Sequence, residues 1–299
     1  MSSRPVSRRM TRAASALTLV LGSALATPLL VAGTAEAATS AATVAVDNGV
    51  VVYTAASGQT NNVSVTATRS GADFTYAISD DVTITTGDGC SYAGPADRTR
   101  VSCLVTGEDS EDPYATLQLS LGDGDDTVAY DNQTGQTYYF ASIDLGDGND
   151  TLTETGGVQG NSVSGDAGDD TLTVGPYTVA LGGDGDDTIK AAKGAIVLAG
   201  DGDDTVYATG NYTSVDGGAG KDVIHGGAGW QDLSGGDGND RIYGGPGDDH
   251  LSGGNGKDVL RGGKGDDTIN GDKGDDHLYG GPGTDTLDGG PGTDVVHQD

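Results

Sequence analysis

The sequence predicts an all-β protein in which a β-solenoid of Gly-rich repeats follows a small β-rich segment. Gly-rich nonapeptides recur between Leu121 and His297, which is the sequence pattern of a repeat architecture. Each nonapeptide carries one aliphatic residue between mostly polar neighbours, as a short strand with a single inward side chain does. Residues 38–120 alternate between aliphatic and small polar residues and show no helical period, so strands are expected there too.

The first 37 residues have the layout of a secretory signal peptide. A basic head over residues 4–12 precedes an apolar stretch over residues 13–31. The small-residue sequence Ala35-Glu36-Ala37 follows, which favours cleavage after Ala37. The alternative is a membrane anchor, which the break at Pro28 disfavours. We therefore expect a secreted, extracellular protein from which residues 1–37 are removed.

The charge of the chain argues against several kinds of partner. Acidic residues number 45 against 15 Lys and Arg, which gives a formal net charge of -30. Only four of the acidic residues are Glu and the other 41 are Asp, whose short side chain suits turns that bind cations. Nucleic acids and anionic membrane surfaces attract basic proteins, so neither is an expected partner. After residue 37 no apolar run is long enough to span a bilayer.

Residues 38–120 predict a small β-rich domain or cap. Alternating segments at 63–67 and 82–85 are separated by turn sequences at 70–71 and 87–89. Cys90 and Cys103 are the only cysteines and flank a polar loop. In an exported chain such a pair predicts a disulfide, which contributes about 2–3 kcal/mol to stability; two free thiols are the alternative.

The repeats form a continuous series in the C-terminal part and a spaced series before it. Nine units run without interruption from Gly217 to His297, and five related units lie upstream. The nine read GGAGKDVIH, GGAGWQDLS, GGDGNDRIY, GGPGDDHLS, GGNGKDVLR, GGKGDDTIN, GDKGDDHLY, GGPGTDTLD and GGPGTDVVH. The five are LGDGDDTVA from residue 121, LGDGNDTLT from 145, GDAGDDTLT from 165, GGDGDDTIK from 182 and AGDGDDTVY from 199.

Each position of the nonapeptide has a physical role. Glycines in the first half permit the positive φ angles and close backbone approach that a tight turn requires. Asp at position six places a carboxylate on that turn. Position eight is aliphatic throughout, at Val128, Leu152, Leu172, Ile189, Val206, Ile224, Leu233, Ile242, Leu251, Leu260, Ile269, Leu278, Leu287 and Val296. A core this thin needs another source of stability, and bound metal is the available one.

These units resemble the haemolysin-type calcium-binding repeat, also called the RTX nonapeptide. The resemblance covers residues 121–299, which is roughly 60% of the chain. It implies a parallel β-roll (β-solenoid) in which two units make one coil, so that turns one coil apart stack on the same side. It also implies multiple Ca²⁺ ions between stacked turns, held by the position-six carboxylates and by backbone carbonyls. Ligation by oxygen alone suits Ca²⁺ and does not suit Zn²⁺.

Within that resemblance, the unit spacing predicts two rows of calcium-binding turns. The fourth-position glycines from Gly124 to Gly220 are 24, 20, 17, 17 and 18 residues apart, which are whole coils. The half-coils between them lack the Asp-bearing turn. The first row therefore begins near residue 121 and carries Asp126, Asp150, Asp170, Asp187, Asp204, Asp222, Asp240, Asp258, Asp276 and Asp294. The second row begins after residue 226 and carries Asp249, Asp267 and Asp285.

The first turn of the second row departs from the pattern. Gln231 replaces the Asp, and an amide oxygen is a poorer ligand for Ca²⁺. Trp230 precedes it and is expected to cover the start of the row. The gaps between stacked turns set an upper limit of about twelve ions.

Calcium is expected to fold the roll. Carboxylates about 5 Å apart repel by on the order of 1–3 kcal/mol per pair, so a row without ions is unfavourable. We therefore expect residues 121–299 to be largely unfolded without calcium and to fold on binding it. Extracellular calcium modules typically bind at ~10⁻⁴–10⁻³ M.

The sequence favours a protein that is not an enzyme. Residues 38–120 contain no His, and all four His lie at positions seven or nine of the repeats. A zinc-protease motif and a Ser-His-Asp triad are therefore not available in that segment. The predicted function is a structural or adhesive calcium-binding protein, whose further partner is a cell-surface polysaccharide or protein. The alternative is a calcium-dependent extracellular enzyme or carbohydrate-binding accessory that uses a face of the solenoid, with residues 138–140 as the place to look for its ligand.

Overall fold

The computed structural model describes residues 41–106, 114–135, 139–157 and 160–298. The predicted signal peptide over residues 1–37 and Tyr138 lie outside this part of the chain. The described residues contain strands and turns and no helix, and residues 40–299 form one compact unit. The predicted all-β class is therefore confirmed.

The described residues form 27 strands. The N-terminal eight are β1 (Ala42–Asp47), β2 (Val50–Thr54), β3 (Asn62–Ser70), β4 (Asp73–Ser79), β5 (Ile84–Thr86), β6 (Cys90–Tyr92), β7 (Arg100–Val105) and β8 (Tyr114–Ser120). They are followed by β9 (Thr127–Asn132), β10 (Tyr139–Asp147), β11 (Thr151–Gly156), β12 (Ser162–Ala167), β13 (Thr171–Val174), β14 (Val179–Asp184), β15 (Thr188–Ala191), β16 (Ile196–Asp201), β17 (Thr205–Ala208) and β18 (Thr213–Gly220). The last nine are β19 (Val223–Gly226), β20 (Gln231–Gly238), β21 (Arg241–Pro246), β22 (His250–Gly256), β23 (Val259–Lys264), β24 (Thr268–Asn270), β25 (His277–Tyr279), β26 (Thr286–Asp288) and β27 (Val295–His297).

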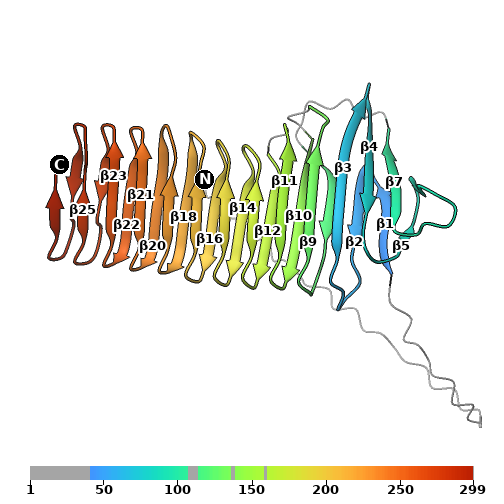
Figure 1. Ribbon diagram of the computed structural model, residues 1–299, viewed down its shortest axis with the longest axis horizontal. Helices are drawn as coiled ribbons and strands as arrows, with labels where there is room; N and C mark the ends of the chain where they lie inside the picture. Colours follow the sequence, from blue (N-terminus) through green and yellow to red (C-terminus); the bar gives the residue numbers. More distant parts are fainter. Residues whose placement is uncertain (1–40, 107–113, 136–138, 158–159, 299) are drawn as a thin grey trace, which may run out of the picture. The chain divides into compact units, whose positions relative to one another are not determined.

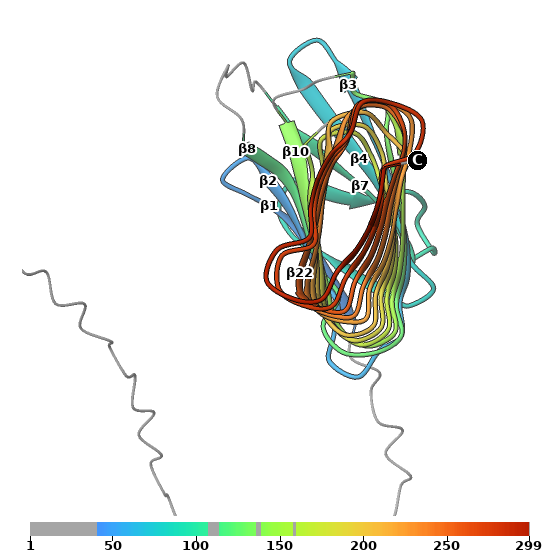
Figure 2. The ribbon, with the colours of Figure 1, turned by 90° about the vertical axis from the view of Figure 1, so that its left-hand side faces the viewer.

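From β8 onward the chain winds as a parallel β-roll. Even-numbered strands from β8 to β26 form one sheet and odd-numbered strands from β9 to β27 form the other, each strand pairing in parallel with the strand one coil away. Figure 1 shows the strands of successive coils lying side by side, and Figure 2 shows the two sheets facing each other along the stack. The predicted parallel β-roll is confirmed.

The core of the roll is a column of aliphatic residues between the two sheets. Position-eight residues of neighbouring coils are direct partners, as Leu152 is to Val128 and to Leu172. From Val128 to Leu278 every position-eight side chain is at most 1% exposed, as the repeat pattern predicted. The last two differ, because no further strand pairs with β26 or β27: Leu287 is only partly buried and Val296 is 46% exposed.

The N-terminal strands extend both sheets of the roll. β1 and β2 form a hairpin whose Asn48-Gly49 turn has positive φ at both residues, the geometry that matches the twist of a two-residue hairpin. β2 pairs in parallel with β8, and β3 pairs in parallel with β9. Large buried side chains, including Tyr53, Phe74 and Tyr76, fill the space between the sheets here.

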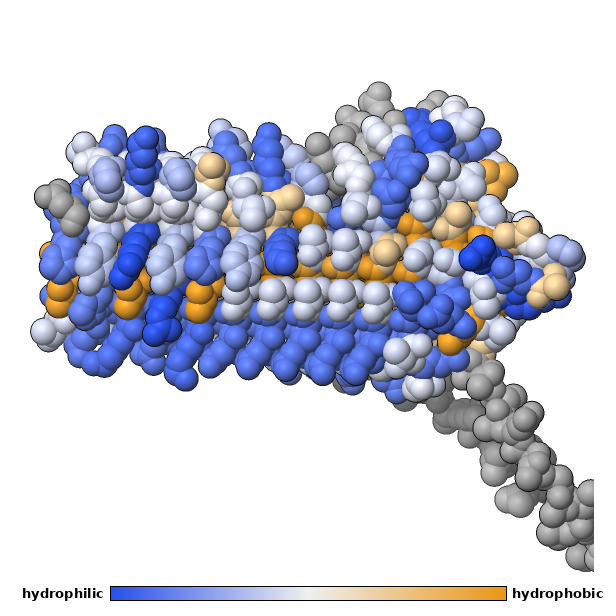
Figure 3. Space-filling view, viewed as in Figure 1, coloured by the Kyte–Doolittle hydropathy of each residue, from blue (hydrophilic) through white to orange (hydrophobic). Residues whose placement is uncertain are grey.

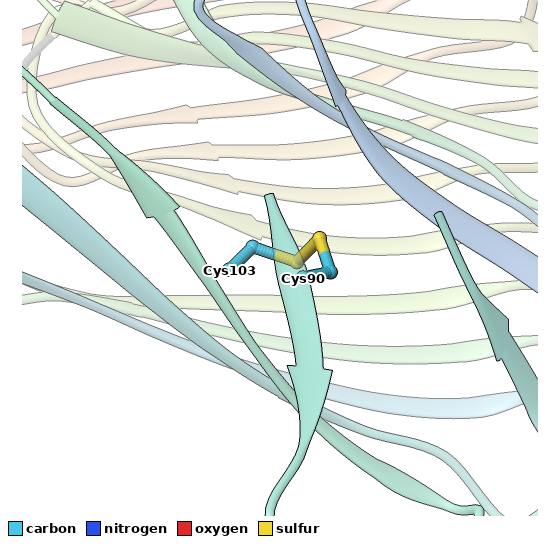
Figure 4. Close-up of a disulfide and its surroundings, with 2 residues drawn as sticks. All are labelled: Cys90 and Cys103. Atoms are coloured by element: carbon cyan, nitrogen blue, oxygen red, sulfur yellow. A yellow bond between two sulfur atoms is a disulfide. The ribbon is translucent and has the colours of Figure 1, made fainter. Parts of the chain in front are cut away.

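A disulfide joins Cys90 of β6 to Cys103 of β7, as Figure 4 shows. The two cysteines are direct partners in an antiparallel strand pair at a sequence separation of 13. β7 also pairs with β4, so the disulfide ties the short edge strand β6 to the hairpin of β3 and β4. The predicted disulfide is present in the structure.

Replacing both cysteines by alanine should lower the free energy of unfolding of the N-terminal strands by about 2–3 kcal/mol, because the cross-link restricts the unfolded chain. Urea unfolding, followed by near-UV circular dichroism, measures the change. The far-UV signal of the repeats should stay the same, since both cysteines lie outside them. An unchanged urea midpoint would contradict the stabilising role.

Candidate functional site

The position-six residues of the first predicted row lie on stacked turns. The backbone N–H of each Asp donates to the Oδ1 atom of the Asp one coil later, at 2.7–3.0 Å. The bond from Asp126 to Asp150 spans 24 residues and the bond from Asp187 to Asp204 spans 17. The irregular spacings are therefore whole coils, and the row is continuous from Asp126 to Asp294.

The second oxygen of each carboxylate has no partner in the protein. Oδ2 is buried without a hydrogen bond in twelve of the thirteen predicted Asp residues, Asp294 being the exception. The side chains from Asp126 to Asp276 in both rows are 0–2% exposed. A buried carboxylate oxygen with no donor or cation beside it is strongly unfavourable, so these atoms mark the places where a positive charge is required.

Nine of the twelve unpartnered oxygens, those from Asp170 to Asp285 except Asp204, lie beside a glycine at position one of their repeat. A Cβ on Gly217, at position one, would lie 2.5 Å from Oδ2 of Asp222 and 2.5 Å from the carbonyl oxygen of Gly235 one coil later. On Gly253 it would lie 2.6 Å from Oδ2 of Asp258 and from the carbonyl oxygen of Gly271. A carboxylate oxygen and a carbonyl oxygen thus converge beside the glycine, and two acceptors facing each other favour a cation between them.

Glycine at position four allows the turns to stack closely. Gly220 has a φ of 153°, and a Cβ there would lie 1.8 Å from the carbonyl oxygen of Gly202 on the preceding turn. Any side chain would therefore push the stacked turns apart. The turn glycines thus bring backbone oxygens of one coil against the next.

Burial raises the pKa of these carboxyl groups. Neighbouring carboxylates add to the rise, while the hydrogen bond from the backbone N–H of the preceding coil opposes it. The pKa rises to about 7 for Asp126, Asp170, Asp187, Asp222 and Asp258, and to about 6 for Asp150, Asp204 and Asp249. It rises in the same direction for Asp240, Asp267 and Asp276. A site that disfavours its own ionised form gains when a cation enters.

The second predicted row stacks in the same way. The N–H groups of Gln231, Asp249 and Asp267 donate to Oδ1 of the Asp one coil later, at 2.9, 2.8 and 3.0 Å. Gln231 is fully buried and its Nε2 donates to the carbonyl oxygens of Gly210 and Ala228, both at 3.3 Å. The Gln231 amide N–H₂ thus donates to backbone carbonyl oxygens at a turn where no Asp carboxylate is present. Trp230 lies next to it, 43% exposed, with its ring 6.2 Å from that of Tyr212.

Upstream of Gln231, neutral side chains close the same edge of the roll. Thr213 pairs with Gln231, and its Oγ1 donates to the carbonyl oxygen of Gly210 at 2.8 Å. Further upstream on this edge, the buried carboxylate of Glu154 accepts hydrogen bonds from Asn161 Nδ2 at 2.7 Å and from Thr178 Oγ1 at 3.1 Å. Both oxygens of this carboxylate accept hydrogen bonds, in contrast to the carboxylates of the Asp rows, so Glu154 leaves no unpartnered oxygen on this edge.

The first row of stacked turns begins one coil before the first recognisable repeat. The backbone N–H of Asn61 donates to Oδ1 of Asp126 at 2.6 Å, and β3 pairs with β9 in the register of a coil. Asn61 thus occupies position six of a turn that precedes the first recognisable repeat. The only trace in the sequence is an aliphatic residue two positions later, Val63, which is too weak a signal to detect alone.

The donor set fits Ca²⁺. Among the described residues no group of three or more His, Cys, Asp or Glu side chains converges on one point, so soft or nitrogen-rich metal sites are not formed there. The convergent atoms are single carboxylate oxygens and backbone carbonyls, which are hard oxygen ligands. In the view of Figure 3 the lower edge of the roll is a continuous hydrophilic band. The side chains of residues 138–140, the predicted place for a further ligand, lie outside the described part.

Comparison with known proteins agrees with this chemistry. The family model described as RTX calcium-binding nonapeptide repeat (4 copies) matches residues 155–176, 179–195, 198–229, 234–269 and 261–296. No curated protein matches the chain significantly. Among the described residues no helix is long and apolar enough to cross a membrane.

The raised pKa values give the metal-free roll a defined pH dependence. A carboxyl whose pKa is higher in the folded chain than in the unfolded chain stabilises the fold while it is protonated. The melting temperature of calcium-free protein should therefore fall as pH rises from 5 to 8, through the pKa values of about 6 and 7. Calcium should remove this trend, because the ligands bind it deprotonated. Thermal unfolding by circular dichroism tests this, and a melting temperature that rises with pH in the absence of calcium would contradict it.

Gln231→Asp should create one further calcium site at the start of the second row. Isothermal titration calorimetry should count one more Ca²⁺ per chain than in the wild type, because a carboxylate replaces the amide group. Gln231→Asn is the matched neutral control and should bind no extra ion. An unchanged stoichiometry for Gln231→Asp would show that this turn cannot hold calcium.

Proposed function

Because residues 155–296 of this chain are RTX calcium-binding nonapeptide repeats, which bind multiple Ca²⁺ ions, we propose that the protein is a secreted, extracellular protein that calcium folds. Its function is structural or adhesive. The proposed ligands are the thirteen Asp residues of the two rows, with backbone carbonyls of the stacked turns. The observation that carries the proposal is the set of buried Oδ2 atoms without a partner.

The same atoms support a folding role for calcium. Each coil between residues 217 and 270 adds only two buried aliphatic side chains to the core, which is little apolar area to offset the ordering of a whole coil. Each coil also adds a buried carboxylate that repels its neighbours. A Ca²⁺ ion between turns reverses that repulsion, so binding and folding of the roll occur together. Calcium outside the cell is abundant enough for sites with dissociation constants of ~10⁻⁴–10⁻³ M.

We propose that residues 38–120 form a cap on the roll. Their strands pair with β8 and β9, so the first coil does not present two free sheet edges. The disulfide and the buried tyrosines give this segment stability that does not depend on metal. The cap therefore offers a folded template on which the first coils assemble.

The second candidate is a calcium-dependent extracellular enzyme or carbohydrate-binding accessory that uses a face of the solenoid. RTX-repeat β-rolls are typically not catalytic, and the carboxylates of this roll repeat at every coil. Exposed aromatic side chains at the turn edge, Tyr177, Tyr212 and Trp230, favour the accessory form over the enzyme. In either case the folded roll supplies the surface and a cell-surface polysaccharide or protein is the partner.

Calcium should fold the mature chain cooperatively. Far-UV circular dichroism should show the β signal rising between about 0.1 and 10 mM Ca²⁺, and Mg²⁺ should not replace it because it keeps its water ligands. Asp240→Asn should raise the calcium midpoint roughly threefold to tenfold, since it removes one carboxylate from the first row. Asp216→Asn makes the same charge change on an exposed strand residue and should leave the midpoint within about twofold.

Two outcomes would count against the proposal. A full β spectrum in chelator at neutral pH would show that the roll does not need calcium to fold. Equal shifts in Asp240→Asn and Asp216→Asn would show that net charge, and not a carboxylate on the turn, sets the calcium response.

A further inference from the structure

A regular row of basic and aromatic side chains runs along the outer face of the odd-numbered sheet. Position nine of seven consecutive coils alternates between a basic residue or His and a Tyr. Pairing of neighbouring strands places these residues in one register: Lys190, Tyr207, His225, Tyr243, Arg261, Tyr279 and His297. We call this the position-nine row.

The side chains of the position-nine row stack on one another. The rings of Tyr207 and His225 are 5.2 Å apart, and those of His225 and Tyr243 are 4.9 Å apart, each pair within 9° of parallel. The Arg261 guanidinium lies over the rings of both Tyr243, at 5.9 Å, and Tyr279, at 5.0 Å. Cation–π and stacking contacts therefore restrict the rotamers of these side chains. Binding of a ligand to them then costs less side-chain entropy.

This face carries no carboxylate, although the chain has a net charge of -30. The eight strands from β13 to β27 in this sheet contain no Asp or Glu. Arg241 adds an exposed cation at position seven, and Thr188 and Thr205 add hydroxyls there. The opposite sheet has acidic residues on its strands, for example the exposed Asp216 on β18 and the half-buried Asp232 on β20. The odd-numbered sheet from β13 to β27 thus has cations and no carboxylates on its strands, whereas the even-numbered sheet has carboxylates on its strands.

A groove lies beside Arg261 of the position-nine row. It has a volume of about 320 Å³ and is lined by Arg261, Gly263, Tyr279, Gly280, Gly281 and Pro282. Three of its six lining residues are glycine, so Arg261 and Tyr279 contribute the large side chains of the groove. A planar guanidinium held in this way matches a carboxylate or sulfate group with two parallel hydrogen bonds.

We propose that this face binds a linear acidic polysaccharide that lies along the position-nine row, across the strands. This inference rests on the proposed calcium-folded extracellular roll, because only stacked coils bring the row together. A nitrogen-bearing side chain (Lys190, His225, Arg261 and His297) recurs at every second coil, roughly 10 Å apart at the usual spacing of paired strands, and Lys190 and Arg261 among them are cations that suit an extended polyanion. The Tyr and Thr hydroxyls suit sugar hydroxyls. The acidic turns on both sides of the sheet repel a broad polyanion such as duplex nucleic acid and confine a narrow chain to the row.

Binding of labelled hyaluronan, dextran sulfate and neutral dextran to the full mature chain in saturating calcium tests the proposal. Fluorescence anisotropy should show binding of at least one acidic polymer and none of neutral dextran, and the two acidic polymers distinguish carboxylate from sulfate recognition. Arg241→Gln with Arg261→Gln should weaken binding roughly tenfold. Lys221→Gln with Lys257→Gln removes the same charge from the turn edge and should change the affinity by less than about twofold.

Circular dichroism of each variant shows whether a loss of polysaccharide binding is due to the substitution itself or to a protein that has not folded. A folded, calcium-loaded protein that binds neither acidic polymer overturns this inference and leaves the proposed function standing. Equal weakening by the two variant pairs, or tighter binding of single-stranded DNA than of either polysaccharide, overturns it as well. A chain that calcium does not fold overturns the proposed function, and with it the face on which this inference rests.

Discussion

One constraint governs the roll: every coil buries a carboxylate oxygen for which the protein supplies no donor. In nine of the twelve Asp residues, the unpartnered Oδ2 lies beside a position-one glycine that leaves room for it. The turn glycines, the close stacking and the thin aliphatic core all follow from bringing these oxygens together. Burial of these oxygens disfavours the ionised carboxyl groups, which raises their pKa values, and a bound cation would offset that cost.

The repeat pattern was sufficient to predict the roll, because each nonapeptide contains its own turn glycines, its inward aliphatic residue and its Asp. Even the upstream spacings of 24, 20 and 17 residues could be assigned to whole coils, and the bonds between stacked Asp residues agree. The pairing of β2 with β8 and of β3 with β9 could not be predicted in this way. Strand partners that are far apart in sequence depend on packing, and Asn61 carries no repeat signature that would reveal its place on the first row.

Different side-chain groups lie between the stacked turns at the two edges of the roll. On one edge carboxylates run from Asp126 to the last coil. On the other edge, hydroxyl and amide donors of Thr213 and Gln231 reach the carbonyl oxygens directly, and Asp residues begin only at Asp249. The sequence indicated where the second row starts, since Gln231 breaks the motif. It could not indicate that the amide donates hydrogen bonds there, because that role depends on the carbonyl of the preceding coil.

The strands lie across the direction in which the coils stack, and this orientation decides how the protein would respond to tension between its ends. Such a force would break the hydrogen bonds between coils sequentially, one coil at a time, and would not shear many of them at once. Resistance would then be set by the weakest contact between adjacent coils, and each bound ion would reinforce one contact. A tether of this kind would yield in small steps and rewind, so that its stiffness follows the calcium concentration around it.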